Sequence, residues 1–64
     1  MRITLQGGET LTLPGCLVRF GTQLGVIGPS CELTHLIRGG RLWKVTGSAG
    51  CTREHVGVID RVEV

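Results

Sequence analysis

Glycine recurs at short intervals along this chain. Eleven glycines are spread over 64 residues and separate short pieces rich in valine, isoleucine, threonine and leucine. Such pieces, bounded by turn-forming residues, are typical of β-strands. A chain of this length holds a single core, so we expect one domain over residues 1–64. The pattern predicts an all-β fold in which five or six short antiparallel strands form a small barrel.

The first two predicted strands are the alternating stretches RITL and TLTL. A two-residue loop over the intervening glycine pair would place their apolar residues on opposite faces. A loop of three or five residues instead pairs Leu5 with Leu11 and Ile3 with Leu13. We therefore predict an odd-numbered loop or a bulge at this turn.

A third strand is predicted in the stretch CLVRF, after a proline–glycine turn. In this strand Cys16, Val18 and Phe20 share one face, and we expect that face to belong to the core. The next strand, LGVIG, contains Gly25 and Gly28, which indicate a bulge or a close backbone approach.

The stretch SCELTHLIRGG is compatible with two structures. Ser30 as a cap, apolar residues at helical spacing and a glycine stop would make a helix of about two turns. A primed two-residue turn at Gly39-Gly40 would instead make a hairpin that pairs Leu36 with Trp43. We favour the hairpin because its second arm, RLWKV, is strongly strand-like.

The C-terminal part of the chain reads as a short helical turn followed by strands. The stretch CTREH can close into one turn capped by Thr52, and VGVIDRVEV then continues in strands that break near Asp60.

Two Cys-x-x-x-His segments are candidates for a metal site. They supply Cys31 with His35 and Cys51 with His55, and two thiolates with two imidazoles form a common structural zinc set. Residues four apart can share an ion on a helix, but in a strand they lie roughly 13 Å apart. Zinc therefore requires the helical alternative, and our main expectation is that no cofactor is bound.

Basic residues cluster around the predicted Gly-Gly turn. Arg38, Arg41, Trp43 and Lys44 lie within seven positions of one another, and Arg19 is a further candidate neighbour. In the hairpin Arg38 faces Arg41, and two like charges at such a position are destabilising without an anion. The cluster therefore indicates nucleic acid or another acidic partner, although the net charge of +2 is mild.

The strand order is similar to that of a known group of folds. The stretches PGCLVRFGTQLGVIG, RLWKV and VIDRVEV resemble the layout of SH3-like barrels, including the KOW and Tudor kinds. Among these, the layout is similar to that of the type II dihydrofolate reductases, which are tetramers of such barrels. The resemblance implies the fold alone, because the Gln-Ile-Tyr triplet of that reductase family has no counterpart in EHVGVID.

Size and composition favour self-association in the cytoplasm. A chain this short has a marginal core, and Phe20 and Trp43 are its only aromatic residues, so we expect a homo-oligomer. The N-terminus lacks an apolar signal region, and no apolar run is long enough to cross a bilayer. Three cysteines, an odd number, indicate reduced thiols and a cytoplasmic protein without a membrane partner.

No enzymatic motif is evident, since the sequence has neither a nucleophile elbow nor a phosphate-binding loop. We therefore expect a non-catalytic binding or assembly module, and the resemblance suggests an accessory protein of a mobile element. The alternatives are a nucleic-acid-binding module, a zinc-stabilised mini-domain and an oligomeric enzyme with a shared pore.

Overall fold

The structure is a computed structural model that describes residues 1–47 and 52–64. The described residues form seven β-strands and no helix, which confirms the all-β class. The number of strands is larger than the five or six expected. The strands are β1 (Arg2–Leu5), β2 (Thr10–Thr12), β3 (Cys16–Phe20), β4 (Gln23–Ile27), β5 (Leu33–Arg38), β6 (Arg41–Thr46) and β7 (Thr52–Glu63). No helix that could span a membrane is therefore found among these residues.

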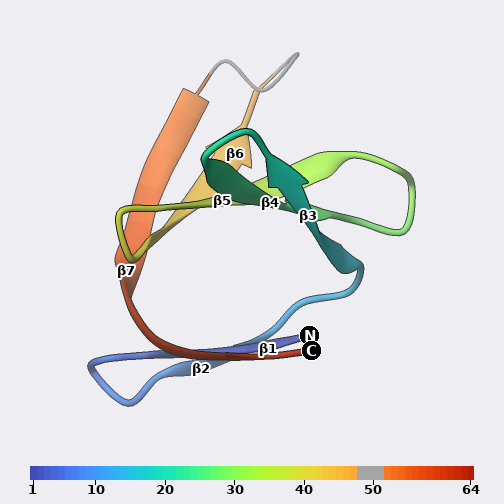
Figure 1. Cartoon of the computed structure of the whole chain (residues 1–64). Helices are drawn as coiled ribbons and strands as arrows, with labels where there is room; N and C mark the ends of the chain where they lie inside the picture. The colour runs from blue at the N-terminus through green and yellow to red at the C-terminus, as the bar shows by residue number, and fades with distance from the viewer. Residues whose placement is uncertain (48–51) are drawn as a thin grey trace.

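All seven strands belong to one antiparallel sheet, in the order β2-β1-β7-β6-β5-β4-β3. Strand β7 joins the two halves of the sheet: residues 52–58 pair with β6 and residues 59–63 pair with β1. Figure 1 shows β7 bending from its run beside β6 into its run beside β1. The end strands β2 and β3 are not paired with each other in the described part of the chain. The sheet is therefore curled but open.

The first hairpin has the predicted odd loop but another register. Strand β1 pairs Ile3 with Leu11, not with Leu13, because the loop is Gln6-Gly7-Gly8. The Gly8 amide donates to the Leu5 carbonyl at 2.9 Å, and Gly8 has a φ of +94°. This is the three-residue loop that ends in a glycine bulge. The alternation of apolar and polar residues requires only that the apolar residues of β1 and β2 share a face. The predicted and the observed register both meet this requirement.

The hairpin of β5 and β6 has the predicted register at every position. Leu36 pairs with Trp43 and Arg38 with Arg41, and the helical alternative for this segment is wrong. Gly39 and Gly40 have φ values of +60° and +73°, as a primed two-residue turn requires.

The segment that follows residue 51 is extended from its start, so the predicted helical turn is wrong for residues 52–55. Two irregularities interrupt the pairing of β7. Val56 is the extra residue opposite β6, and Asp60 is the extra residue opposite β1. The break expected near Asp60 is thus a β-bulge within a continuous strand, and bulges increase the local bend.

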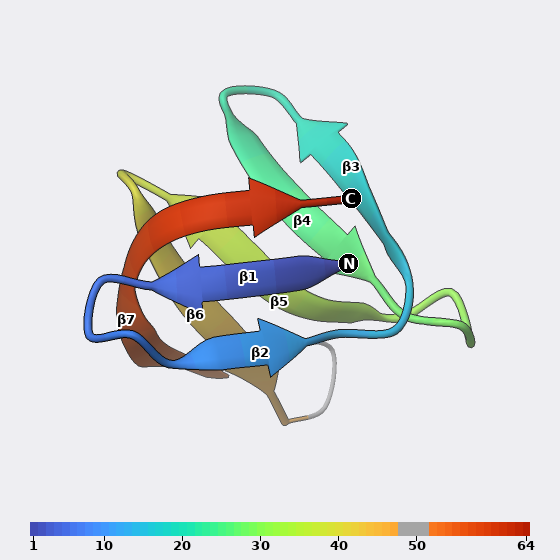
Figure 2. The ribbon, with the colours of Figure 1, turned by 90° about the horizontal axis from the view of Figure 1, so that it is seen from below.

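The core cluster lies between the β1–β2 hairpin and one face of the sheet formed by β3 to β6, to which Ile37 of β5 and Leu42 of β6 contribute. We call this face, which carries Leu42 and Val26, the inner face, and the opposite one the outer face. Ile3 and Leu42 are fully buried and form one cluster with Leu5, whose side chain lies over Gly57. Figure 2 shows β1 lying between β2 and the end of β7, with the two chain termini close together.

The prediction that Cys16, Val18 and Phe20 face the core is wrong. Cys16 is exposed, Val18 is half-buried and Phe20 is 42% exposed. The alternation in β3 is as predicted, but Leu17, which pairs with the buried Val26, is on the inner face. Leu17 and Val18 are both half-buried, so neither row of β3 belongs to the fully buried core.

Candidate anion-binding site

The outer face carries a continuous row of residues across five strands. Residues directly opposite each other on neighbouring strands lie on the same face of a sheet, and the register places Val18, Gly25, Leu36, Trp43 and His55 side by side. The β3 end of this row is apolar. Its β7 end is aromatic and polar, and basic side chains flank it there.

A pocket of about 400 Å³ opens on the basic part of the outer face. Leu36 is almost fully buried beneath it and Trp43 is half-buried, so the pocket has an apolar floor. The lining residues, contributed by β4 to β7 and the turn between β5 and β6, are Gln23, Leu36, Arg38, Gly39, Arg41, Trp43 and Arg53.

Three arginines surround this floor. Arg38 and Arg41 face each other across the Gly-Gly turn, and Arg53 enters from β7 opposite Val45. All three are exposed. Within residues 1–47 and 52–64 the only ion pair joins Arg61 Nε to Glu63 Oε1 at 3.7 Å, so none of the three has a carboxylate partner there. The pocket is therefore a concentration of positive charge beside an apolar surface.

His55 connects Arg41 to Trp43. Arg41 Nη1 lies 3.3 Å from His55 Nε2, and since a guanidinium can only donate, the imidazole nitrogen accepts. The ring of His55 also meets Trp43 edge to face, with centroids 5.0 Å apart and an interplanar angle of 67°. His55 therefore contacts both the guanidinium and the indole of the site.

The structure brings together three of the four basic and aromatic residues predicted to bind an anion. Arg38, Arg41 and Trp43 line the pocket. Lys44 does not: it follows Trp43 in the strand, so its side chain is on the opposite face, beside His35. Arg19, in β3, is not a lining residue either.

Arg53 is the basic residue of the site that sequence reasoning missed. Residues 51–55 were assigned to a helical turn, and this assignment concealed the alternation along β7. With His55 placed opposite Trp43, alternation puts Arg53 two positions away on the same face. The signal was thus present, but it needed the correct secondary structure.

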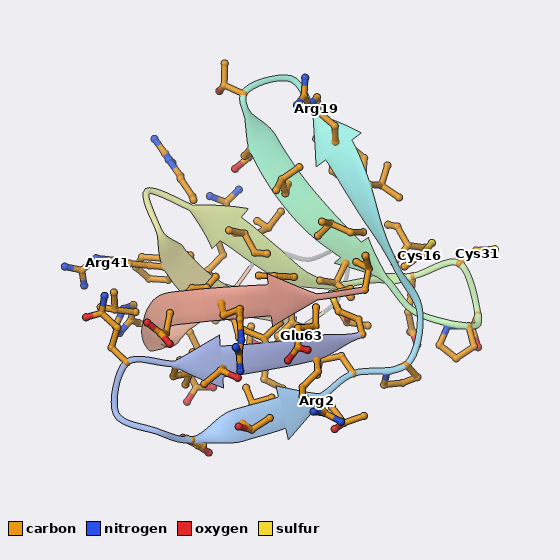
Figure 3. All side chains as sticks on the ribbon, turned by 60° about the horizontal axis from the view of Figure 1, so that its bottom comes forward. Arg2, Cys16, Arg19, Cys31, Arg41 and Glu63 are labelled. Atoms are coloured by element: carbon orange, nitrogen blue, oxygen red, sulfur yellow. The ribbon has the colours of Figure 1, made fainter. Side chains whose placement is uncertain are left out.

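The two histidines proposed as zinc ligands lie on opposite faces of the sheet. His35 pairs with Lys44 and His55 with Trp43, and neighbouring residues of one strand point to opposite sides. Cys31 is an exposed turn residue, and it lies at the opposite end of the molecule from Arg41, the partner of His55 (Figure 3). Cys51 lies outside the described residues, and among those described no group of three metal-binding side chains occurs.

His35 has its own environment, unrelated to the pocket. The Thr34 hydroxyl donates to the Val26 carbonyl at 3.2 Å, so its oxygen is free to accept from His35 Nδ1 at 3.0 Å. Burial of the imidazole, and secondarily the charge of Lys44, hold the pKa of His35 below its usual 6.5. The folded state therefore favours the neutral ring.

The low pKa of His35 predicts a pH-dependent stability. Below about pH 6.5 the unfolded chain protonates His35 while the folded chain resists protonation, so the free energy of unfolding should fall as the pH is lowered. Urea unfolding near neutral pH and at mildly acidic pH measures this slope. His35→Gln should make the slope shallower, whereas His55→Gln retains the His35 contribution. Equal slopes for wild type and His35→Gln would refute the assignment.

Comparison with known proteins does not identify a family. No protein-family model, no curated protein and no solved structure matches the chain.

Proposed function

We propose that this protein is a small non-catalytic binding module, an open relative of the SH3-like barrel, which holds an acidic segment of a partner protein in the arginine pocket. One observation carries the proposal. Three guanidiniums without a carboxylate partner in the described chain surround the floor made by Leu36 and Trp43.

The arginines suit a carboxylate ligand. A guanidinium presents a planar set of donors that matches a carboxylate, and such charge-assisted bonds are stronger than neutral ones. Arg38 and Arg41 are direct cross-strand partners, and their repulsion is relieved when an anion lies between them. An acidic ligand therefore gains two interactions and removes one unfavourable contact.

The apolar floor favours a peptide over a nucleic acid as the ligand. Proteins that bind single-stranded nucleic acid stack successive bases on several aromatic side chains along a basic groove. Here Trp43 is the only aromatic residue that lines the pocket, and the outer face toward β3 is apolar rather than basic. A segment that alternates acidic and aliphatic residues matches both parts of this surface.

The fluorescence of Trp43, the only tryptophan in the chain, gives a direct test. A peptide of alternating glutamate and leucine should change this fluorescence saturably, and binding should weaken as salt screens the charges. Arg38→Gln should weaken binding at least about tenfold, since a hydrogen bond between charged groups contributes about 1.5–3 kcal/mol. Arg19→Gln removes the same charge outside the pocket and should leave the affinity nearly unchanged.

Three outcomes would contradict the proposal. Equal losses in Arg38→Gln and Arg19→Gln would mean that only net charge attracts the peptide. Binding of a mixed-sequence single-stranded oligonucleotide, without binding of the peptide, would establish a nucleic-acid module instead. No fluorescence change with either ligand would show that the pocket does not bind anions of these two classes.

A further inference from the structure

Strand β3 is a free edge of the sheet. Its five residues pair with β4 on one side, and no other strand of the described chain pairs with them. Figure 2 shows β3 beside β4 at the margin of the sheet. An edge strand presents unpaired N–H and C=O groups, which are a template for another strand. The other edge strand, β2, has only three residues, two of them threonines, so it offers a shorter and less apolar edge for pairing than β3.

The outer face beside this edge is apolar. Phe20 and Leu33 are 42% and 37% exposed, and apart from Val64 they are the large hydrophobic residues exposed in the described chain. Their side chains meet over Gly25, where an added Cβ would lie 2.5 Å from Phe20 and 2.9 Å from Leu33. Val18, the partner of Gly25, continues this patch to the edge.

We infer that a second copy of this chain pairs with β3, antiparallel, about a two-fold axis at Val18. In this register Val18 faces the same residue of the second copy, Cys16 faces Phe20, and Leu17 faces Arg19. All five residues are paired, and the apolar rows of the two outer faces become continuous. The interface is distinct from the arginine pocket and does not depend on the proposed function.

The neighbouring registers are excluded by charge repulsion, by loss of a pairing residue or by a mismatch between the outer and inner faces of the two copies. A shift by two residues in one direction sets Arg19 directly opposite Arg19 of the second copy, and like charges so placed are destabilising. The same shift in the other direction leaves Phe20 without a partner. A shift by one residue turns the outer face of one copy toward the inner-face side of the other. The Val18-centred register avoids opposed arginines, keeps the two outer faces on the same side and pairs all five residues of β3.

This assembly extends the sheet rather than stacking two sheets. A two-fold axis perpendicular to the sheet keeps both outer faces on the same side, so the two arginine pockets would open in the same direction. A ligand with two acidic segments could then bind both pockets, and linked binding of this kind raises the overall affinity.

Residue 18 permits a charge test because the two-fold axis makes it its own partner. The wild type should have twice the monomer mass of 6.8 kDa by sedimentation equilibrium and native mass spectrometry. Val18→Lys and Val18→Glu should each be monomeric, since each places two like charges in contact. Mixing the two variants should restore a dimer with one copy of each, because the charges are then opposite.

The rescue by mixing separates loss of the interface from loss of the fold. Circular dichroism of each variant reports whether the sheet persists, and Val45→Lys, a half-buried valine of the same face in β6, is the matched control that should remain dimeric. A monomeric wild type overturns the inference. An oligomer that neither Val18 variant changes, or two folded monomeric variants that do not form a dimer on mixing, also overturns it.

Discussion

Gly15→Ala is expected to destabilise the protein by about 3 kcal/mol or more, a large part of the stability of a domain of this size. Gly15 has a φ of +110°, which non-glycine residues rarely adopt, so the substitution strains the backbone itself. A Cβ at this position would also lie 2.0 Å from the carbonyl oxygen of Ile27, and backbone cannot swing aside as a side chain can. Thermal or urea unfolding measures the loss.

Gly21→Ala is the matched control for this prediction. Gly21 also has a positive φ, +59°, but nothing lies within 4 Å of its Cβ position. The substitution should therefore cost only the backbone term, about 1–2 kcal/mol. Similar losses of unfolding free energy in the two variants would show that the close approach of Gly15 to Ile27 does not fix the start of β3.

Leu42→Ala is expected to cost about 2–5 kcal/mol, the range for removing a large aliphatic side chain from a packed core. Leu42 is fully buried, and it joins the sheet half formed by β6 to the β1 residues Ile3 and Leu5. Its loss leaves a cavity between the two halves. Urea unfolding should show a lower midpoint with an almost unchanged slope.

The control for this cavity is Leu33→Ala. Leu33 is 37% exposed on the outer face, so the same truncation removes less buried surface and should cost about 1 kcal/mol or less. If Leu33→Ala proves as costly as Leu42→Ala, the core has been placed on the wrong face of the sheet.

The parts of the fold with local determinants could be predicted from the sequence. The β5–β6 register follows from one Gly-Gly turn, because a two-residue primed loop leaves no freedom in the pairing of its arms. This turn also placed Arg38 against Arg41, so these two arginines of the candidate site were predicted with it. At the first hairpin, alternation determined the parity of the loop but could not choose between Leu11 and Leu13 as the partner of Ile3.

The remaining features depend on distant parts of the chain. Which row of β3 lies on the inner face follows from the pairing of Leu17 with Val26, whose burial depends on the rest of the fold, and nothing within CLVRF encodes it. The bulge at Asp60 shifts the alternation of β7, so Ile59 and Val62 both pack against the core although they are three residues apart. Arg53 was missed for a related reason, since its face is defined only after β7 is aligned with β6.

The sharing of β7 between the two halves also sets an order of assembly. Strands β3 to β6 pair with their neighbours in sequence, so these hairpins close short loops. Strand β1, in contrast, pairs Arg2 with Glu63, and contacts so distant in sequence form slowly. During synthesis the N-terminal hairpin leaves the ribosome first, yet it has no sheet to join until residues 59–63 are available. Ile3 and Leu5, two of the most deeply buried side chains in the folded protein, are therefore among the last to leave water.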